Sequence, residues 1–186
     1  MSLVLSRRPI LRAAVIGGYV LVAEWARVLI STAPNAAAPA LLLGGLALAL
    51  TAFTFAPERL GLGRSRLALR ILGGCALGAI LLLPAAARSS AVPLIPAGLA
   101  AAAVVVSMGE EIAFRGALYA ALEDAGGAPL AIVGSTALWT AGHALSHPPE
   151  FLLAVAAAGL LLALWRWACR DLVAPILGHV IADLAL

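Results

Sequence analysis

Residues 97–145 decide the fold, and they read AGLAAAAVVVSMGEEIAFRGALYAALEDAGGAPLAIVGSTALWTAGHAL. The stretch is largely apolar, and its one clear break is the segment EDAGGAP at 123–129. Glycine and proline in such a segment end a helix and form a tight turn. An apolar helix of roughly 18–20 residues crosses a bilayer. The stretch therefore predicts two antiparallel transmembrane helices, at about 97–122 and 130–145.

Apolar runs of similar length fill the rest of the chain. Hydrophobic residues make up 63% and charged residues 11%, with a mean hydropathy of +1.07. In a soluble domain, hydrophobic residues make up about 45–50% and charged residues about 25%. We therefore expect an all-α polytopic transmembrane bundle of about seven spans, folded as one membrane domain over 1–186. The further spans run up to about residue 30 and over about 40–56, 67–83, 151–167 and 172–186.

The basic residues predict how the bundle is oriented. All 12 of them are arginine, and most fall into clusters at 7–12, 59–70 and 166–170, which seven spans would place on one side. Basic loops stay in the cytoplasm, so we expect a cytoplasmic N-terminus. The arginines lie between apolar runs, which argues against a nucleic-acid partner. Arginine without lysine, beside abundant alanine and glycine, suggests a bacterial source and its cytoplasmic (inner) membrane as the location.

The first apolar run is open to a second reading as a signal peptide, because Ser31, Thr32 and Ala33 resemble a cleavage site. Glu24 and Arg27 interrupt the run, so we expect it to be retained as the first span. These two residues lie three apart and can pair on one helix face. We interpret them as a structural pair.

A small set of ionisable residues lies inside the predicted spans. A charge at the centre of a membrane helix costs at least ~2.5–3.5 kcal/mol on insertion scales, so such residues face the bundle interior and mark functional sites. The set is Glu110, Glu111, Arg115, His143, His179 and Asp183, with His147 near a helix end.

The expected depths of these residues agree with one another. Counted at about 1.5 Å per residue from the turns at 123–129 and 166–171, Glu110 and His143 lie roughly 20 Å deep. On the same count His179 and Asp183 lie roughly 12 and 18 Å from that membrane face. Three separate helices thus converge on one level, which we expect to be reached from the cytoplasmic side.

Spacing within each helix assigns partners. Glu111 and Arg115 are i,i+4 with the acid first, the favourable order for an ion pair. Glu110 points about 100° away from Glu111 and is left free for chemistry. His179 and Asp183 are also i,i+4 and share a face.

Three short motifs collect these residues: an acid pair with an arginine, an aromatic residue with a histidine, and a histidine with an acid. They are Glu110-Glu111-x-x-x-Arg115, Trp139-x-x-x-His143 and His179-x-x-x-Asp183. In order and spacing they resemble the EExxxR, FxxxH and HxxxN/D motifs of the CPBP family, the CAAX-protease and bacteriocin-processing (Abi) intramembrane endopeptidases. The resemblance covers roughly 97–186, so it implies a catalytic core there and accessory spans over 1–96. Trp139 replaces the usual Phe, and Asp183 stands where many members have Asn.

The resemblance implies an intramembrane protease that acts on a membrane-associated protein or peptide precursor without a cofactor. Glu110 would be the general base for a water molecule, and His143 would bind and orient that water. His179 would donate to the oxyanion. Asp183 would assist as a protonated donor, or orient His179 if it is ionised. Structural support would come from Glu111, Arg115 and Trp139.

Other functions remain open on the sequence alone. His143 and His147 lie i,i+4, a spacing that zinc proteases use, so zinc is an alternative cofactor. Buried acids and histidines also mark the ion paths of small transporters and proton relays. A bacteriocin-immunity protein that keeps the fold is a further alternative.

Overall fold

The computed structural model describes residues 8–63, 66–86 and 95–185, and every regular element in these ranges is helical. The all-α prediction is therefore confirmed. Arg7 and Arg64, which belong to the predicted basic clusters, lie outside the described residues. The α-helices are α2 (Pro9–Ser31), α3 (Ala37–Ala49), α4 (Pro57–Leu60), α5 (Leu67–Ala86), α6 (Ala97–Glu111), α7 (Tyr119–Gly142), α8 (Pro149–Cys169) and α9 (Val173–Ala185). Shorter helical turns connect them at η1 (Leu50–Thr54), η2 (Ile112–Leu118) and η3 (His143–Leu145).

Four described helical stretches are long and apolar enough to cross a membrane: Pro9–Ser31, Ala37–Thr54, Ala97–Leu145 and Pro149–Cys169. Two shorter apolar helices, Leu67–Leu83 and Val173–Ala185, pack among them. The third stretch has 49 residues and folds back on itself, so it supplies two helical segments. The described chain thus has about seven apolar helical segments, in agreement with the prediction of about seven spans.

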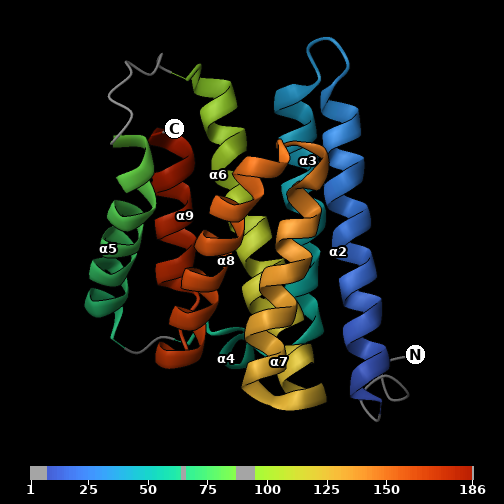
Figure 1. Ribbon diagram of the computed structural model, residues 1–186, viewed down its shortest axis with the longest axis vertical. Helices are drawn as coiled ribbons and strands as arrows, with labels where there is room; N and C mark the ends of the chain where they lie inside the picture. Colours follow the sequence, from blue (N-terminus) through green and yellow to red (C-terminus); the bar gives the residue numbers. More distant parts are fainter. Residues whose placement is uncertain (1–7, 64–65, 87–94, 186) are drawn as a thin grey trace.

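The reversal of the third stretch occurs at Gly126–Gly127, at the lower end of the bundle in Figure 1. Gly127 has φ +76° and ψ −176°, a conformation that is essentially restricted to glycine. The helix before it and the helix after it run antiparallel, as the sequence predicts. This hairpin brings the two halves of the 97–145 stretch side by side.

The middle of this stretch departs from the expected regular helix. Residues Ile112–Leu118 form a π-helical turn, η2, between α6 and α7. A π-helical turn disrupts the i→i−4 ladder of hydrogen bonds. Arg166, on α8, is 2% exposed, and its Nε donates to the Arg115 carbonyl at 3.1 Å. The sequence places Arg166 in the basic cluster at 166–170, and the structure adds that its guanidinium is buried against η2.

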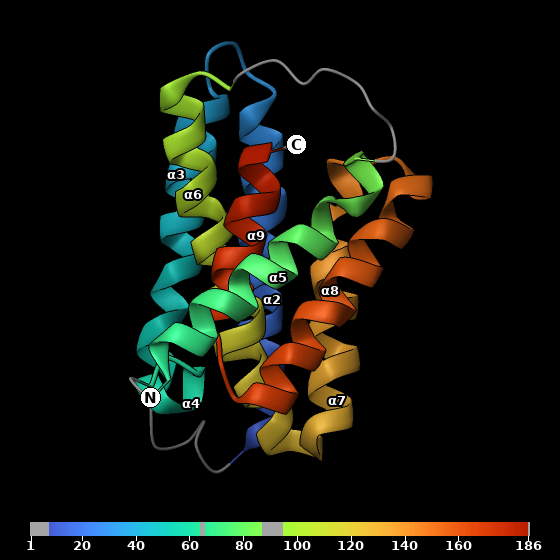
Figure 2. The same ribbon diagram turned by 90° about the vertical axis from the view of Figure 1, so that its left-hand side faces the viewer.

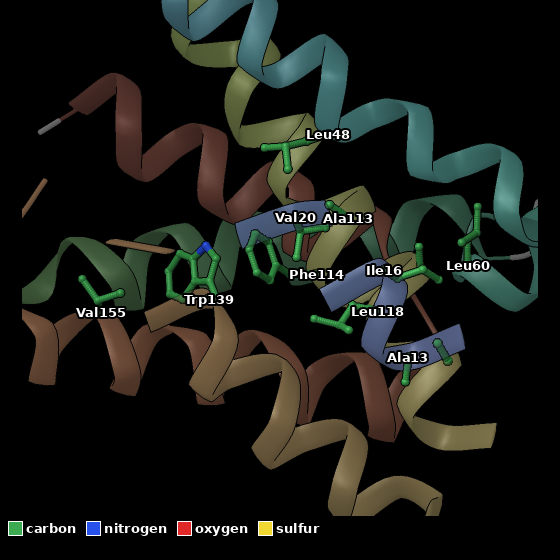
Figure 3. Close-up of a cluster of buried hydrophobic side chains, with 12 residues drawn as sticks. Ala13, Ile16, Val20, Leu48, Leu60, Ala113, Phe114, Leu118, Trp139 and Val155 are labelled. Carbon is green, nitrogen blue, oxygen red and sulfur yellow. The ribbon is translucent and has the colours of Figure 1, made fainter. Parts of the chain in front are cut away.

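Helix packing centres on α6, which lies against α3 on one side and α9 on the other, while α5 packs on α9. α7 packs between α2 and α8. A buried apolar cluster joins α2, η2 and α7, with Val20, Phe114 and Trp139 among its members (Figure 3). Close approach between helices relies on glycine: a Cβ at Gly109 on α6 would collide with the Gly45 carbonyl oxygen on α3.

The described arginines of the predicted clusters lie at the start of α2, on α4, around the start of α5 and at the end of α8, and these helix ends meet at the end of the bundle that carries the hairpin turn (Figure 1). Arg170 lies 2.6 Å from Glu123, and Arg70 lies 3.2 Å from Asp171. Arg59 pairs with Asp124 at the same end. The C-terminus and the α7–α8 junction lie at the opposite end (Figures 1 and 2). The bundle therefore has one arginine-rich end among the described residues.

Candidate active site

Glu110, on the last turn of α6, is 4% exposed and is contacted from two other helices. Its Oε2 accepts a hydrogen bond from Trp139 Nε1 of α7 at 3.0 Å. His143 Nε2 lies 3.8 Å from the same oxygen. Its Oε1 lies 3.5 Å from Nη2 of Arg27, on α2. Both carboxylate oxygens thus face polar groups in an otherwise apolar bundle.

Glu111, the next residue, faces a separate set of partners. Both Glu111 and Arg115 are fully buried, and Arg115 Nη1 lies 2.9 Å from Glu111 Oε1. The same oxygen accepts a hydrogen bond from His179 Nδ1 of α9, also at 2.9 Å. Glu111 therefore joins α6 to α9 in addition to pairing with Arg115.

His179 continues this chain of contacts towards α9 and α6. Its Nε2 lies 3.4 Å from Asp183 Oδ2. Ser107 Oγ lies 2.6 Å from the same oxygen and 2.7 Å from the Ala103 carbonyl oxygen. Sequence reasoning missed Ser107. Its signal was a polar residue three positions before Glu110, on the same side of the helix.

Trp139 contacts both groups of residues, those around Glu110 and those around Glu111. The Arg115 guanidinium lies 4.1 Å above its ring, and His143 and His179 meet it edge-on with ring centroids 4.7 and 5.7 Å away. Gly159 on α8 makes room for the indole, since a Cβ there would lie 2.6 Å from Trp139 Cε3. We expected Trp139 to give structural support in place of phenylalanine, and the structure adds that its indole donates a hydrogen bond to Glu110.

The two histidines near the end of α7 differ in their surroundings. His143 Nδ1 lies 2.9 Å from the Trp139 carbonyl oxygen, so this nitrogen carries the proton and Nε2 faces Glu110. His147 stacks on Phe151 at 4.8 Å and contacts the Ser146 hydroxyl at 2.8 Å. Burial and the nearby His143 lower the pKa of the His147 imidazole. Among the described residues, no group of three or more His, Cys, Asp or Glu side chains is arranged to hold a metal ion.

A cavity of about 930 Å³ lies against these side chains. Its polar wall contains Arg27, Glu110, His143, His179 and Asp183. The facing wall is apolar and comes from α5 and α8, with Ile80, Leu81, Ala158 and Leu161 among its residues.

Among the residues that line the cavity, Ser146 and Glu150 are exposed, as are Ile80 on α5 and Ala154 and Ala157 on α8. Ser146 and Glu150, the rim of the cavity, flank the α7–α8 junction, at the end of the bundle opposite α4 and the arginines (Figure 2). We expected access from the arginine-rich, cytoplasmic side. The structure corrects this expectation: the rim lies at the other end, because α7 ends and α8 begins there.

The first helix supplies one charge that lines the cavity and the buried carboxylate that pairs with it. Arg27 lines the cavity, and Glu24 is fully buried beside it with Oε2 2.5 Å from Arg27 Nη2. Trp25 Nε1 donates to the Ala141 carbonyl at 3.0 Å and ties this part of α2 to α7. We interpreted the pair as purely structural, and its contact with Glu110 was not predicted. The available signal was two opposite charges in the middle of an apolar span.

Comparison with known proteins gives one family. A family model described as type II CAAX prenyl endopeptidase Rce1-like matches residues 90–185. This is about half of the chain, and it includes the three motifs that carry Glu110, His143 and His179. No curated protein and no solved structure matches the chain.

Proposed function

The chain belongs to the Rce1-like family of type II CAAX prenyl endopeptidases, which are CPBP intramembrane proteases, and from this premise we propose a glutamate-activated mechanism. In this proposal the protein hydrolyses a peptide bond of a membrane-associated protein or peptide precursor. The observation that carries the proposal is the pairing of Glu110 Oε2 with His143 Nε2, 3.8 Å apart at the wall of the cavity.

The gap between these two atoms suits a water molecule. It is longer than a direct hydrogen bond, and a polar contact of this length is commonly bridged by water. With Nδ1–H directed to the Trp139 carbonyl, the neutral His143 ring offers a lone pair at Nε2. A bridging water would donate one proton to Nε2 and the other to Glu110. Its oxygen lone pair would then face the cavity.

The proposed reaction proceeds in two steps. The water oxygen bonds to the scissile carbonyl carbon while Glu110 takes a water proton, and the carbonyl electron pair moves onto its oxygen. The tetrahedral intermediate then re-forms the carbonyl and breaks the C–N bond. Glu110 returns the proton to the leaving amine nitrogen, so the enzyme ends in its starting state.

We propose that His179 and Asp183 stabilise the oxyanion. His179 Nδ1–H is directed to Glu111, so Nε2 can donate only when the ring is an imidazolium. For Asp183 we favour the protonated form. A protonated Asp183 would donate to the oxyanion as asparagine would, whereas an ionised carboxylate can only accept.

The substrate side of the proposal follows from the cavity walls. An apolar wall from α5 and α8 faces the ionisable residues, and the rim at Ser146 and Glu150 is exposed. A substrate segment that leaves the membrane would place its apolar side chains on the apolar wall. Its backbone would then lie against the ionisable residues. We propose that no metal takes part: the His147 ring lies 5.5 Å from that of His143, but it stacks on Phe151 and contacts the Ser146 hydroxyl.

The test is cleavage by the purified protein in lipid vesicles. The probes are a fluorescence-quenched farnesylated CAAX peptide and membrane proteins from cells that lack the enzyme. Glu110→Gln should abolish cleavage of whatever the wild type cuts, because an amide cannot accept the proton. Glu58→Gln, which changes an exposed glutamate on α4 that does not line the cavity, is the matched control and should keep activity. Cleavage by Glu110→Gln, or loss of wild-type activity on treatment with a zinc chelator, would contradict the mechanism.

A further inference from the structure

Arg27 lies on α2, outside the residues that the family model matches, and it reaches the centre of the proposed site. We propose that Arg27 is a positioning residue for Glu110, and that Glu24 anchors it. This inference rests on the proposed function, since it assigns a role relative to the proposed general base. It makes the first helix part of the catalytic machinery.

The first step of the argument is how the Glu110 carboxylate is held. Oε1 faces Arg27 Nη2 at 3.5 Å, while Oε2 receives the Trp139 indole N–H at 3.0 Å. One contact on each oxygen fixes the rotation of the carboxylate about its last bond. The fixed orientation directs Oε2 towards His143 Nε2, where the water is proposed to lie. Without Arg27, Trp139 alone would hold the group at one oxygen.

The second step is how Arg27 itself is held. Glu24 Oε2 lies 3.1 Å from Arg27 Nε and 2.5 Å from Nη2, so it engages the guanidinium at two nitrogens. Glu24 is fully buried, and its Oε1 has no hydrogen-bond partner among the described residues. A buried carboxylate depends strongly on its one counter-ion. Glu24 therefore anchors the cation that Glu110 shares.

The third step is the space for the arginine stem. A Cβ on Gly44 of α3 would lie 2.5 Å from Arg27 Cδ and 2.7 Å from Cγ. Any residue other than glycine would push the stem away from its present path. Two helices before the catalytic motifs, α2 and α3, thus fit together around this one side chain.

The first experiment moves Arg27 without changing any charge. Gly44→Ala should lower kcat about 10- to 100-fold, the cost of misplacing a reacting group by about 1 Å, with KM changed less than about threefold. Gly18→Ala is the matched control, because a Cβ there meets no atom within 4 Å. Wild-type kcat in a folded Gly44→Ala variant would overturn the proposal.

The second experiment separates positioning from structure by charge removal. Arg27→Gln strands Glu24 and should lower both the thermal midpoint in detergent and kcat. Glu24→Gln/Arg27→Gln removes the stranded carboxylate, so it should recover the midpoint while kcat stays at least about tenfold below wild type. Arg27→Lys should keep part of kcat, since an ammonium ion supplies the same charge. Recovery of kcat together with the midpoint in the double variant would show a structural role only.

The same assays distinguish this inference from the proposed function. If Glu110→Gln is inactive while the double variant has wild-type kcat, the glutamate mechanism stands and the role of Arg27 is wrong. If Glu110→Gln is active, the proposed function itself fails. Failure of the Arg27 inference and failure of the glutamate mechanism therefore give different sets of active and inactive variants.

Discussion

At the scale of single residues, the most telling contacts are those of the fully buried Arg115. It pairs with Glu111, and its guanidinium covers the Trp139 ring. We predict that Arg115→Ala lowers the free energy of unfolding by about 3–5 kcal/mol, because it removes one partner of a buried ion pair and leaves Glu111 with His179 as its remaining ion-pair partner. The measurement is the thermal midpoint and accumulation in membranes. Arg170→Ala, whose side chain is 62% exposed, is the control and should cost about 1 kcal/mol or less. Equal effects of the two changes would contradict the prediction.

Asp183 tests the proposed protonation. An asparagine in its place would donate through the side-chain amide where the proposed carboxylic acid donates, so Asp183→Asn should keep most of the activity. Asp183→Leu has similar size and no donor, and it should lose activity. The comparison is made on kcat for the same probe. Complete loss of activity in Asp183→Asn would instead indicate that an ionised carboxylate is needed.

At the scale of helices, the hairpin at Gly127 is the clearest case in which a local rule predicts tertiary structure. Gly127→Ala should lower the free energy of unfolding by about 1–3 kcal/mol, because its backbone conformation is essentially reserved for glycine. Gly98→Ala is the control: a Cβ there meets no atom within 4 Å, and alanine favours the helix. Thermal unfolding in detergent measures both. A neutral Gly127→Ala would show that the turn tolerates another conformation.

Helix existence and the hairpin could be predicted, because Gly and Pro punctuation and apolar length are local signals. The π-helical turn could not, since a contact within it, the hydrogen bond from Arg166 to the Arg115 carbonyl, comes from a residue 51 positions away that no local pattern indicates. The motif spacing correctly indicated which polar residues share a helix face. It could not bring Arg27 or Ser107 into the site. In a membrane protein the lipid-facing and protein-facing surfaces are both apolar, so periodicity does not reveal which helices pack together.

At the scale of the whole molecule, the arginine-rich end and the cavity rim lie at opposite ends of the bundle. Basic residues favour the cytoplasmic side, so we expect the rim at Ser146 to face away from the cytoplasm. In a Cys75→Ser/Cys169→Ser background, Ser146→Cys should react with a membrane-impermeant maleimide added to intact cells. Exposed Cys169, retained alone at the arginine-rich end, is the control and should react only after the cells are opened. The reverse pattern would place the rim in the cytoplasm.

The contact between Gly45 and Gly109 has a consequence for how the enzyme can be divided. At this crossing α3 presses its backbone directly onto α6, one residue before Glu110, with no space for even a methyl group. A fragment cut at the border of the family match would leave that stretch of catalytic helix bare to lipid tails. We therefore expect the smallest working unit to include α3 as well as the residues that the family model matches.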